Sequence, residues 1–161
     1  MTGTGRNTFS PDRPMTRAML VTVLWRLAGS PEVTEKAAFT DVASGSYYEA
    51  AVAWAAKNEI ASGTSATTFE PNKAVTRKQL AKFLFSYAVY QGMDAVTLSE
   101  NPISFEDHAS VSGYAVSAMQ WAVGQGLING TDGKLLPTGT ATRCQFAAIL
   151  NRFTASQSEK A

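Results

Sequence analysis

The chain has very few of the residues that enzymes and metalloproteins use at their reactive centres. Cys144 is the one cysteine and His108 the one histidine among 161 residues. A single cysteine excludes a disulfide within the chain, and a single histidine has no second imidazole with which to build a metal cluster. No glycine-rich loop stands in a context that would hold phosphate. The sequence therefore predicts no metal site, no cofactor and no catalysis, and a partly buried, structural Cys144.

Net charge and long hydrophobic runs are equally scarce. The formal net charge is +1, so no broad basic field exists for a nucleic-acid partner. No apolar run approaches the ~20 residues that cross a membrane, and residues 1–6 have no apolar core of the kind found in a signal peptide. These absences predict one globular domain without nucleic-acid binding or membrane insertion. If the protein is exported, its signal peptide is expected in sequence beyond this chain.

What the chain does have is repetition. Residues 9–17, 69–77 and 135–143 share one pattern: a large apolar residue, a proline two positions later, and a threonine-arginine pair at the end. A second pattern occurs twice, over residues 39–63 and 105–130, with Phe-x-Asp, then Trp-Ala, then glycine. Repetition at this spacing outweighs any single residue, because it specifies the architecture before local structure is considered.

This order of motifs resembles the S-layer homology module of bacterial surface proteins. The resemblance runs from Gly3 to Phe153, which is nearly the whole chain. It implies an all-α fold of tandem helical repeats in a pseudo-threefold bundle. It also implies an extracellular module that binds secondary cell-wall polysaccharide, often through pyruvylated sugars, in grooves between neighbouring copies.

One copy is shorter than the others. Gly3 precedes Phe9 by the same six residues that separate Gly63 from Phe69, and no Phe-x-Asp segment or tryptophan helix comes before it. We expect a truncated first repeat at 1–34, a second repeat at 35–95, a third at 96–153 and a flexible tail at 154–161, together in one compact domain. Excision from a larger surface protein is favoured, with a second chain that completes the truncated repeat as the alternative.

The threonine-arginine motifs predict helix starts. A threonine hydroxyl before each helix can accept a hydrogen bond from an amide of the first turn. The expected N-caps are Thr16, Thr76 and Thr142. Gln79 and Gln145 can complete capping boxes, whereas Met19 cannot. The family commonly has glutamate at these three positions; we favour the capping role of that glutamate over a ligand contact.

The tryptophan segments predict two further helices, over residues 47–58 and 112–125. Tyr48 and Tyr114 are expected on their buried faces, at helical spacing from the alanines. Trp54 and Trp121 are either core residues, the more frequent case, or platforms that stack on sugar rings.

Asp41 and Asp107 precede these two helices in separate copies. Capping or turn formation is favoured for both over a ligand contact. Because they are equivalent positions of different repeats, they are not expected to share a cleft as a glycosidase pair would.

The three arginines carry the functional hypothesis. Arg17, Arg77 and Arg143 each stand at a helix N-terminus, where the helix dipole disfavours a cation. A guanidinium beside free helix amides would form an anion site suited to a pyruvyl carboxylate. The alternative is that each arginine ties neighbouring copies together through an aspartate or a backbone carbonyl.

Together these patterns predict a non-catalytic module that anchors a larger protein to the cell wall. The three arginines would hold the anion, with Trp54, Trp121 and the two aspartates in support, and Gly63 and Gly130 would let the ligand approach the backbone. The rival hypothesis is a structural module that assembles surface proteins without a ligand of its own.

Overall fold

The computed structural model describes residues 3, 5–95 and 103–158. Its elements in chain order are α1 (Arg17–Leu27), α2 (Glu49–Lys57), α3 (Arg77–Tyr90), the 3-10 turns η2 (His108–Ser110) and η3 (Gly113–Ala115), α4 (Val116–Gly124) and α5 (Arg143–Ser158). Extended pairing in these residues is limited to isolated bridges. The predicted all-α repeat bundle is confirmed. In the same residues, no helix is both long and apolar enough to cross a membrane.

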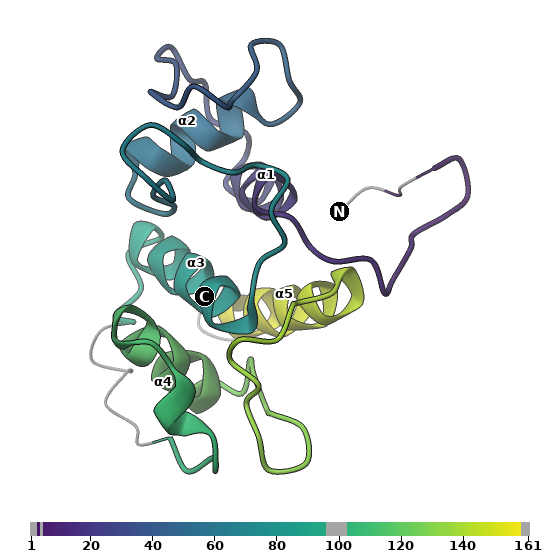
Figure 1. Ribbon diagram of the computed structural model, residues 1–161, viewed down its shortest axis with the longest axis vertical. Coiled ribbons are helices and arrows are strands. Elements are labelled where there is room, and N and C mark those ends of the chain that lie inside the picture. Colours follow the sequence, from purple (N-terminus) through teal and green to yellow (C-terminus); the bar gives the residue numbers. More distant parts are fainter. Residues whose placement is uncertain (1–2, 4, 96–102, 159–161) are drawn as a thin grey trace.

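A closed ring of backbone hydrogen bonds joins the three copies. The amide of Met15 donates to the carbonyl of Ala141, that of Ala141 to Val75, and that of Val75 to Met15, each at 2.9 Å. All three residues are buried and directly precede the N-caps of α1, α3 and α5. The ring therefore sets the three helices around one centre, which gives the bundle its pseudo-threefold arrangement (Figure 1).

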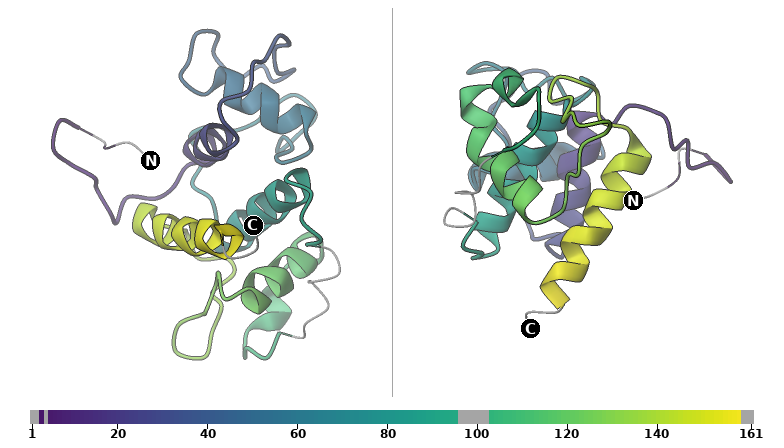
Figure 2. Two further views of the ribbon diagram at one scale, coloured as in Figure 1. Left: turned by 180° about the vertical axis from the view of Figure 1, so that it is seen from behind. Right: turned by 90° about the horizontal axis from the view of Figure 1, so that it is seen from below.

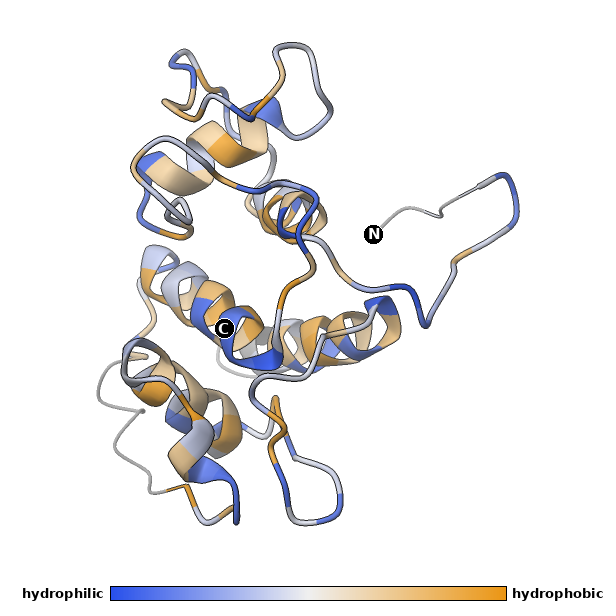
Figure 3. Cartoon of the chain, in the orientation of Figure 1, coloured by the Kyte–Doolittle hydropathy of each residue, from blue (hydrophilic) through white to orange (hydrophobic). Residues whose placement is uncertain are grey.

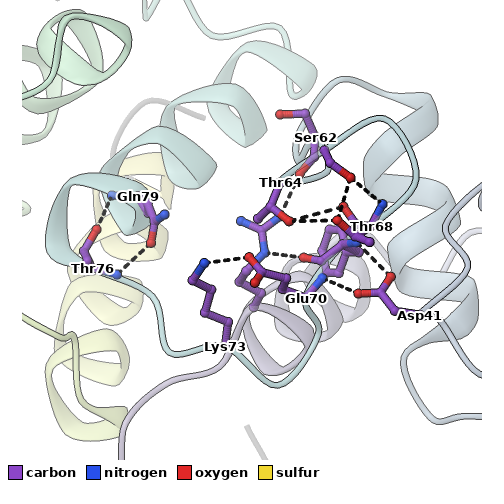
Figure 4. Close-up of polar contacts among 11 residues, drawn as sticks. Asp41, Ser62, Thr64, Thr68, Glu70, Lys73, Thr76 and Gln79 are labelled. Carbon is purple, nitrogen blue, oxygen red and sulfur yellow. Dashed lines mark hydrogen bonds and ion pairs between the residues drawn. The ribbon is translucent and has the colours of Figure 1, made fainter.

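The predicted helix caps are present. Thr76 and Gln79 form a complete capping box at the start of α3 (Figure 4). Thr142 and Gln145 exchange the same two bonds at α5. At α1 the Thr16 hydroxyl accepts from the amide of Met19, whose side chain returns no bond. The loss of one capping bond at Met19 costs about 1 kcal/mol or less of helix stability.

The two tryptophan helices lie against the helices of the preceding copy. α2 packs on α1, and α4 packs on α3 (Figure 1). Both helices are shorter than the sequence predicts. α2 begins at Glu49 rather than at residue 47, and residues 113–115 form a 3-10 turn before α4 begins. That turn takes Tyr114 out of the helical register, and the residue is 56% exposed. The prediction of a buried Tyr114 was wrong.

Both tryptophans belong to the core, which follows the apolar faces of the helices (Figure 3). Trp121 has no exposed surface and Trp54 is 3% exposed. Trp54 meets Tyr90 edge to face at 5.3 Å between centroids, and Trp121 meets Phe85 at 5.8 Å. Neither indole presents a face to solvent, so the predicted sugar-stacking role is wrong and the core alternative holds.

Two smaller expectations also need correction. The tail expected from residue 154 is helical as far as Ser158, and the C-terminal end of α5 projects past the other helices (Figure 2). Cys144 is exposed, because it lies on the outer side of the first turn of α5. Part of the expected boundary between the second and third repeats, at 95–96, lies outside the described residues.

Candidate functional site

Each arginine of the repeated motif bonds to the backbone of the next copy. The Nε atom donates to the carbonyl of the large apolar residue that opens the Phe-x-Pro motif. The pairs are Arg17 with Phe69 at 2.7 Å, Arg77 with Leu135 at 2.7 Å, and Arg143 with Phe9 at 3.0 Å. The third pair closes the cycle from the last copy back to the first. The expected backbone carbonyl of a neighbouring copy is therefore a partner of every arginine.

The first-turn amides of these helices are occupied as well. In α1, the amide of Arg17 donates to Lys73 at 3.0 Å and that of Ala18 to Pro71 at 2.9 Å. The amides at the start of α3 and α5 make equivalent bonds, to Gly139, Pro137, Arg13 and Pro11. These first-turn amides are therefore already bonded within the protein and are not free for a ligand. This part of the predicted anion site is wrong, and only the side chains remain to hold an anion.

The three guanidinium groups differ in how much surface they offer. Arg17 and Arg143 are each 5% exposed, whereas Arg77 is half-buried. Arg17 also donates from Nη2 to the carbonyl of Ser62 at 2.7 Å, and its guanidinium lies 4.5 Å from the centroid of Phe69. Desolvation lowers the pKa of Arg17 and of Arg77, and both pKa values start far above neutrality, so both groups remain cations.

Asp41 and Asp107 fix the segment that the arginines bind. The carboxylate of Asp41 accepts from the amides of Phe69 at 2.8 Å and Glu70 at 2.7 Å (Figure 4). Asp107 accepts from Leu135 at 2.7 Å and from the following residue at 2.8 Å. Burial alone would raise the pKa of either aspartate, but the bonded amides lower it below its usual value. Asp41 and Asp107 therefore stabilise turns, which is the role favoured from the sequence.

That segment is conformationally strained in every copy. The middle residue of the motif has a positive φ, at 50° for Ser10, 55° for Glu70 and 52° for Leu136. A left-handed backbone is unfavourable for residues other than glycine, and surrounding contacts must hold it. The aspartate on one side and the arginine on the other supply such contacts in the second and third copies. In these two copies the turn is therefore held between an aspartate of its own copy and the arginine of the preceding copy.

The two motif glycines make room for a phenylalanine of their own copy. A Cβ at Gly63 would lie 2.6 Å from Cε1 of Phe39, and one at Gly130 would collide with Phe105. Gly130 also has φ +70. The backbone of these glycines was expected to be approached by a ligand, and in the structure it is approached by a phenylalanine ring of the protein. Both glycines still line the grooves described next.

A groove lies where the first, second and third copies meet; we call it the Arg17 groove. Its volume is about 430 Å³. It is lined by Arg17, Ser62, Gly63, Thr64, Gln79, Lys82, Phe83 and Tyr114. Burial raises the pKa of the Tyr114 hydroxyl, against the influence of Arg17, so this hydroxyl stays protonated and can donate a hydrogen bond.

An equivalent groove lies between the second and third copies; we call it the Arg77 groove. Its volume is about 190 Å³. It is lined by Arg77, Leu127, Ile128, Asn129, Gly130, Thr131, Gln145, Ala148, Ile149 and Arg152. Gln145 corresponds to Gln79 in the repeat, and Ala148 corresponds to Lys82. Within the described residues no aromatic side chain takes the place of Tyr114 here.

The predicted site residues are divided between the grooves and other parts of the fold. Four predicted site residues line the grooves: Arg17, Arg77, Gly63 and Gly130. Both tryptophans and both aspartates lie outside these linings and act in the core or in turns. Tyr114, Lys82 and Arg152 were missed. The sequence did contain a sign of Lys82: this lysine interrupts an otherwise apolar stretch, and the third copy has Ala148 at the equivalent position.

Within the described part of the chain, no group of three or more potential metal ligands is assembled.

Comparison with known proteins agrees with the repeat pattern. The family described as S-layer homology domain matches residues 1–18, 38–81 and 104–147. The surface-layer 125 kDa protein of Lysinibacillus sphaericus is 34% identical over 93% of this chain and 12% of its own length. The endoglucanase of Bacillus sp. (strain KSM-635) is 31% identical over 94% of this chain and 16% of its own length. The exoglucanase XynX of Acetivibrio thermocellus is 28% identical over 88% of this chain and 13% of its own length.

The chain spans less than a fifth of each of these relatives. Their named activities therefore describe much longer proteins, and the similarity covers only the repeat region. The family match and the surface-layer relative support a cell-wall anchoring module with a location at the cell surface.

Proposed function

Because the chain belongs to the S-layer homology domain family, we propose that it is a non-catalytic module that anchors a larger surface protein by binding an anionic secondary cell-wall polysaccharide. The observation that carries this proposal is the composition of the two grooves between copies. Among the residues that the structure describes, the lining of each groove includes two cationic side chains and no carboxylate. A pyruvylated sugar, which carries one carboxylate on a neutral ring, matches that lining.

The charge of the grooves is the first support. Arg17 and Lys82 line one groove, and Arg77 and Arg152 line the other. Charges at a partly desolvated surface interact more strongly than the same charges in bulk water. A guanidinium can hold a carboxylate through two parallel hydrogen bonds, and an ammonium can hold it as a point charge.

The neutral groups of the Arg17 groove suit the ring of a sugar. Tyr114 offers an exposed aromatic face and a hydroxyl, and Gln79 and Thr64 add an amide and a hydroxyl. Aromatic faces pack on apolar faces of sugars while polar groups nearby fix the orientation. Tyr114 thus takes the role that the sequence assigned to the tryptophans.

A third pocket of about 220 Å³ lacks this composition. It lies beside Trp54 and Tyr90, away from the repeated arginines, and its lining includes both Glu32 and Lys57. The mixed charge gives no preference for an anion. The inter-copy grooves are therefore the better candidates for an acidic polymer.

The second candidate function is a structural module with no ligand of its own. The specific observation in its favour is the cycle of arginine Nε bonds, which ties the copies together without any ligand. The two functions are compatible, because Nε faces the neighbouring backbone while Arg17 and Arg77 also line grooves. The remainder of a larger surface protein, and a second chain or segment that completes the truncated repeat, stay as proposed partners.

Calorimetric titration with a pyruvylated secondary cell-wall polysaccharide tests the proposal. The control is the same polymer after acid removal of its pyruvate. We expect binding to the intact polymer and at least tenfold weaker binding to the depyruvylated one. Equal binding to both would show recognition of neutral sugars instead. Binding to neither would favour the structural module.

A further inference from the structure

The Arg17 groove has a cationic residue that the repeat motif does not provide. Lys82 lies in the second turn of α3 and is half-buried, and its side chain forms part of the wall of the groove. The equivalent residue of α5 is Ala148, in the wall of the Arg77 groove. The equivalent residue of α1 is Thr22, which is buried and bonds to the carbonyl of Ala18. Lys82 is thus specific to one groove.

Arg17 cannot readily supply the contact to an anion in this groove. Two of its nitrogens donate to the carbonyls of Phe69 and Ser62, both at 2.7 Å. Its guanidinium lies 4.5 Å from the centroid of Phe69 and 5.3 Å from that of Phe83, and the residue is 5% exposed. Its positive charge still favours an anion nearby, but two of its five N–H donors are already bonded to carbonyls and the residue is almost completely buried.

Lys82 has the opposite properties. Its Nζ lies 5.5 Å from the centroid of Phe85, and among the residues that the structure describes no carboxylate pairs with it. An ammonium on a flexible stem keeps three donors that can turn toward a ligand. The long apolar stem can lie along the groove wall while the charge reaches the entrance.

We propose that Lys82 is the residue that contacts the anionic substituent of the polymer in the Arg17 groove, with Tyr114 against the sugar ring. This inference rests on the proposed function and extends it by assigning the acidic group to one groove and one side chain. Arg17 then acts as a positioning residue: it bonds to the carbonyl of Ser62 in the lining of the groove, and its buried positive charge attracts the anion. The Arg77 groove lacks both Lys82 and Tyr114 and is the weaker site.

The test is a titration of variants with the intact and the depyruvylated polymer. Loss of a hydrogen bond to a charged group weakens binding by about tenfold to a hundredfold. Lys82→Ala is expected to lose that much affinity for the intact polymer and little for the depyruvylated one. Lys82→Arg is expected to keep most of the discrimination, because the charge is retained. Melting temperatures of both variants should equal that of the wild type.

Lys78→Ala is the matched control. Lys78 lies one turn earlier on the same helix, and its Nζ bonds to the hydroxyl of Ser112 at 2.8 Å, outside the lining of the groove. It removes the same charge and should leave discrimination unchanged. Ala148→Lys is the complementary gain: it places the missing ammonium in the Arg77 groove and should restore binding to Lys82→Ala.

The outcomes separate this inference from the function on which it rests. If the wild type discriminates between the polymers and Lys82→Ala discriminates equally well, Lys82 is not the contact and the proposed function stands. If Lys78→Ala loses as much as Lys82→Ala, the effect is one of net charge and the assignment is overturned. If the wild type itself does not discriminate, the inference and the anionic part of the proposed function fail together.

Discussion

The Arg17 groove and the Arg77 groove are built by the same motifs and yet differ in what they offer a ligand. Both combine an arginine of one copy with the glycine loop and the capping glutamine of the next. The first holds about 430 Å³ and has Lys82 and Tyr114; the second holds about 190 Å³ and has Ala148 and Arg152. The repeated motifs therefore determine the frame of each groove, and residues between the motifs determine its chemistry.

The third copy accounts for much of this difference. It contributes Tyr114 to the Arg17 groove from the segment that precedes α4. The residue equivalent to Tyr114 in the Arg77 groove would come from a Phe-x-Asp segment of the first copy, at a repeat position ahead of Gly3. A groove between two copies thus depends on a third, which follows from the cyclic arrangement of the bundle.

The largest expected effect is a difference in protein stability between alanine variants of Arg17 and Arg77. Arg17→Ala removes a buried guanidinium with two hydrogen bonds, and it leaves the carbonyls of Phe69 and Ser62 unpaired. We expect a loss of about 3 kcal/mol in the free energy of unfolding, and about half that for Arg77→Ala, which is half-buried and loses the bond to Leu135. Urea denaturation of both variants measures the difference. Equal losses would contradict the distinction drawn between the two arginines.

The next prediction concerns the flank between α5 and α1. Tyr87 of α3 and Phe153 of α5 are buried beneath Trp54 and Trp121, whereas the equivalent Leu27 of α1 is 40% exposed. A helix like α2, fused ahead of Gly3 as a copy of residues 38–62, should cover Leu27 and raise the unfolding free energy by about 1–2 kcal/mol. The same fusion with alanine at its tryptophan is the control. A gain that survives this alanine substitution would argue against packing on this flank.

The aspartates give a smaller effect that depends on pH. The folded pKa of Asp41 lies below its unfolded value of about 3.9, so its contribution to stability is complete above that pH and is lost as pH falls through the folded pKa. Asp41→Asn should lower the melting temperature by a few degrees at pH 7 and reduce the fall in melting temperature between pH 5 and 3. Thermal melts across this range measure both. An unchanged acid dependence would show that the amide bonds to Phe69 and Glu70 add nothing.

The smallest effect tests the sugar contact. Tyr114→Ala should weaken polymer binding by about tenfold or less, since one aromatic contact contributes roughly 0.5–1.5 kcal/mol. Tyr90→Ala is the control, because Tyr90 is comparably exposed but lines the pocket beside Trp54. A larger loss for Tyr90→Ala than for Tyr114→Ala would move the sugar to that pocket.

Much of the fold could be predicted because its helices depend on interactions between residues that are close in the sequence. Thr76 and Gln79 cap a helix through atoms three residues apart, and the alanines beside Trp54 pack at helical spacing. Repetition then extended each local prediction to the other copies. The individual helices followed from those two features, whereas the pseudo-threefold bundle was expected only from the resemblance to the S-layer homology module.

The site was harder to predict because its contacts join distant residues. Arg17 meets Phe69 and Ser62 across copies, and no local rule shows that Lys73 and Pro71 occupy the amides at its helix terminus. The burial of Trp121 depends on Phe85 and Phe153 from two other helices. The 3-10 turn that exposes Tyr114 broke the helical spacing on which its predicted burial relied.

A heteronuclear NMR titration with a pyruvylated oligosaccharide released from the polymer would locate the binding site on the protein. If anionic polymer binds in the inter-copy grooves, the largest amide shifts occur at residues 62–64, 79–83 and 114, and smaller ones at 128–131 and 145–152. Shifts concentrated at residues 31–34 and at the indole of Trp54 would contradict it.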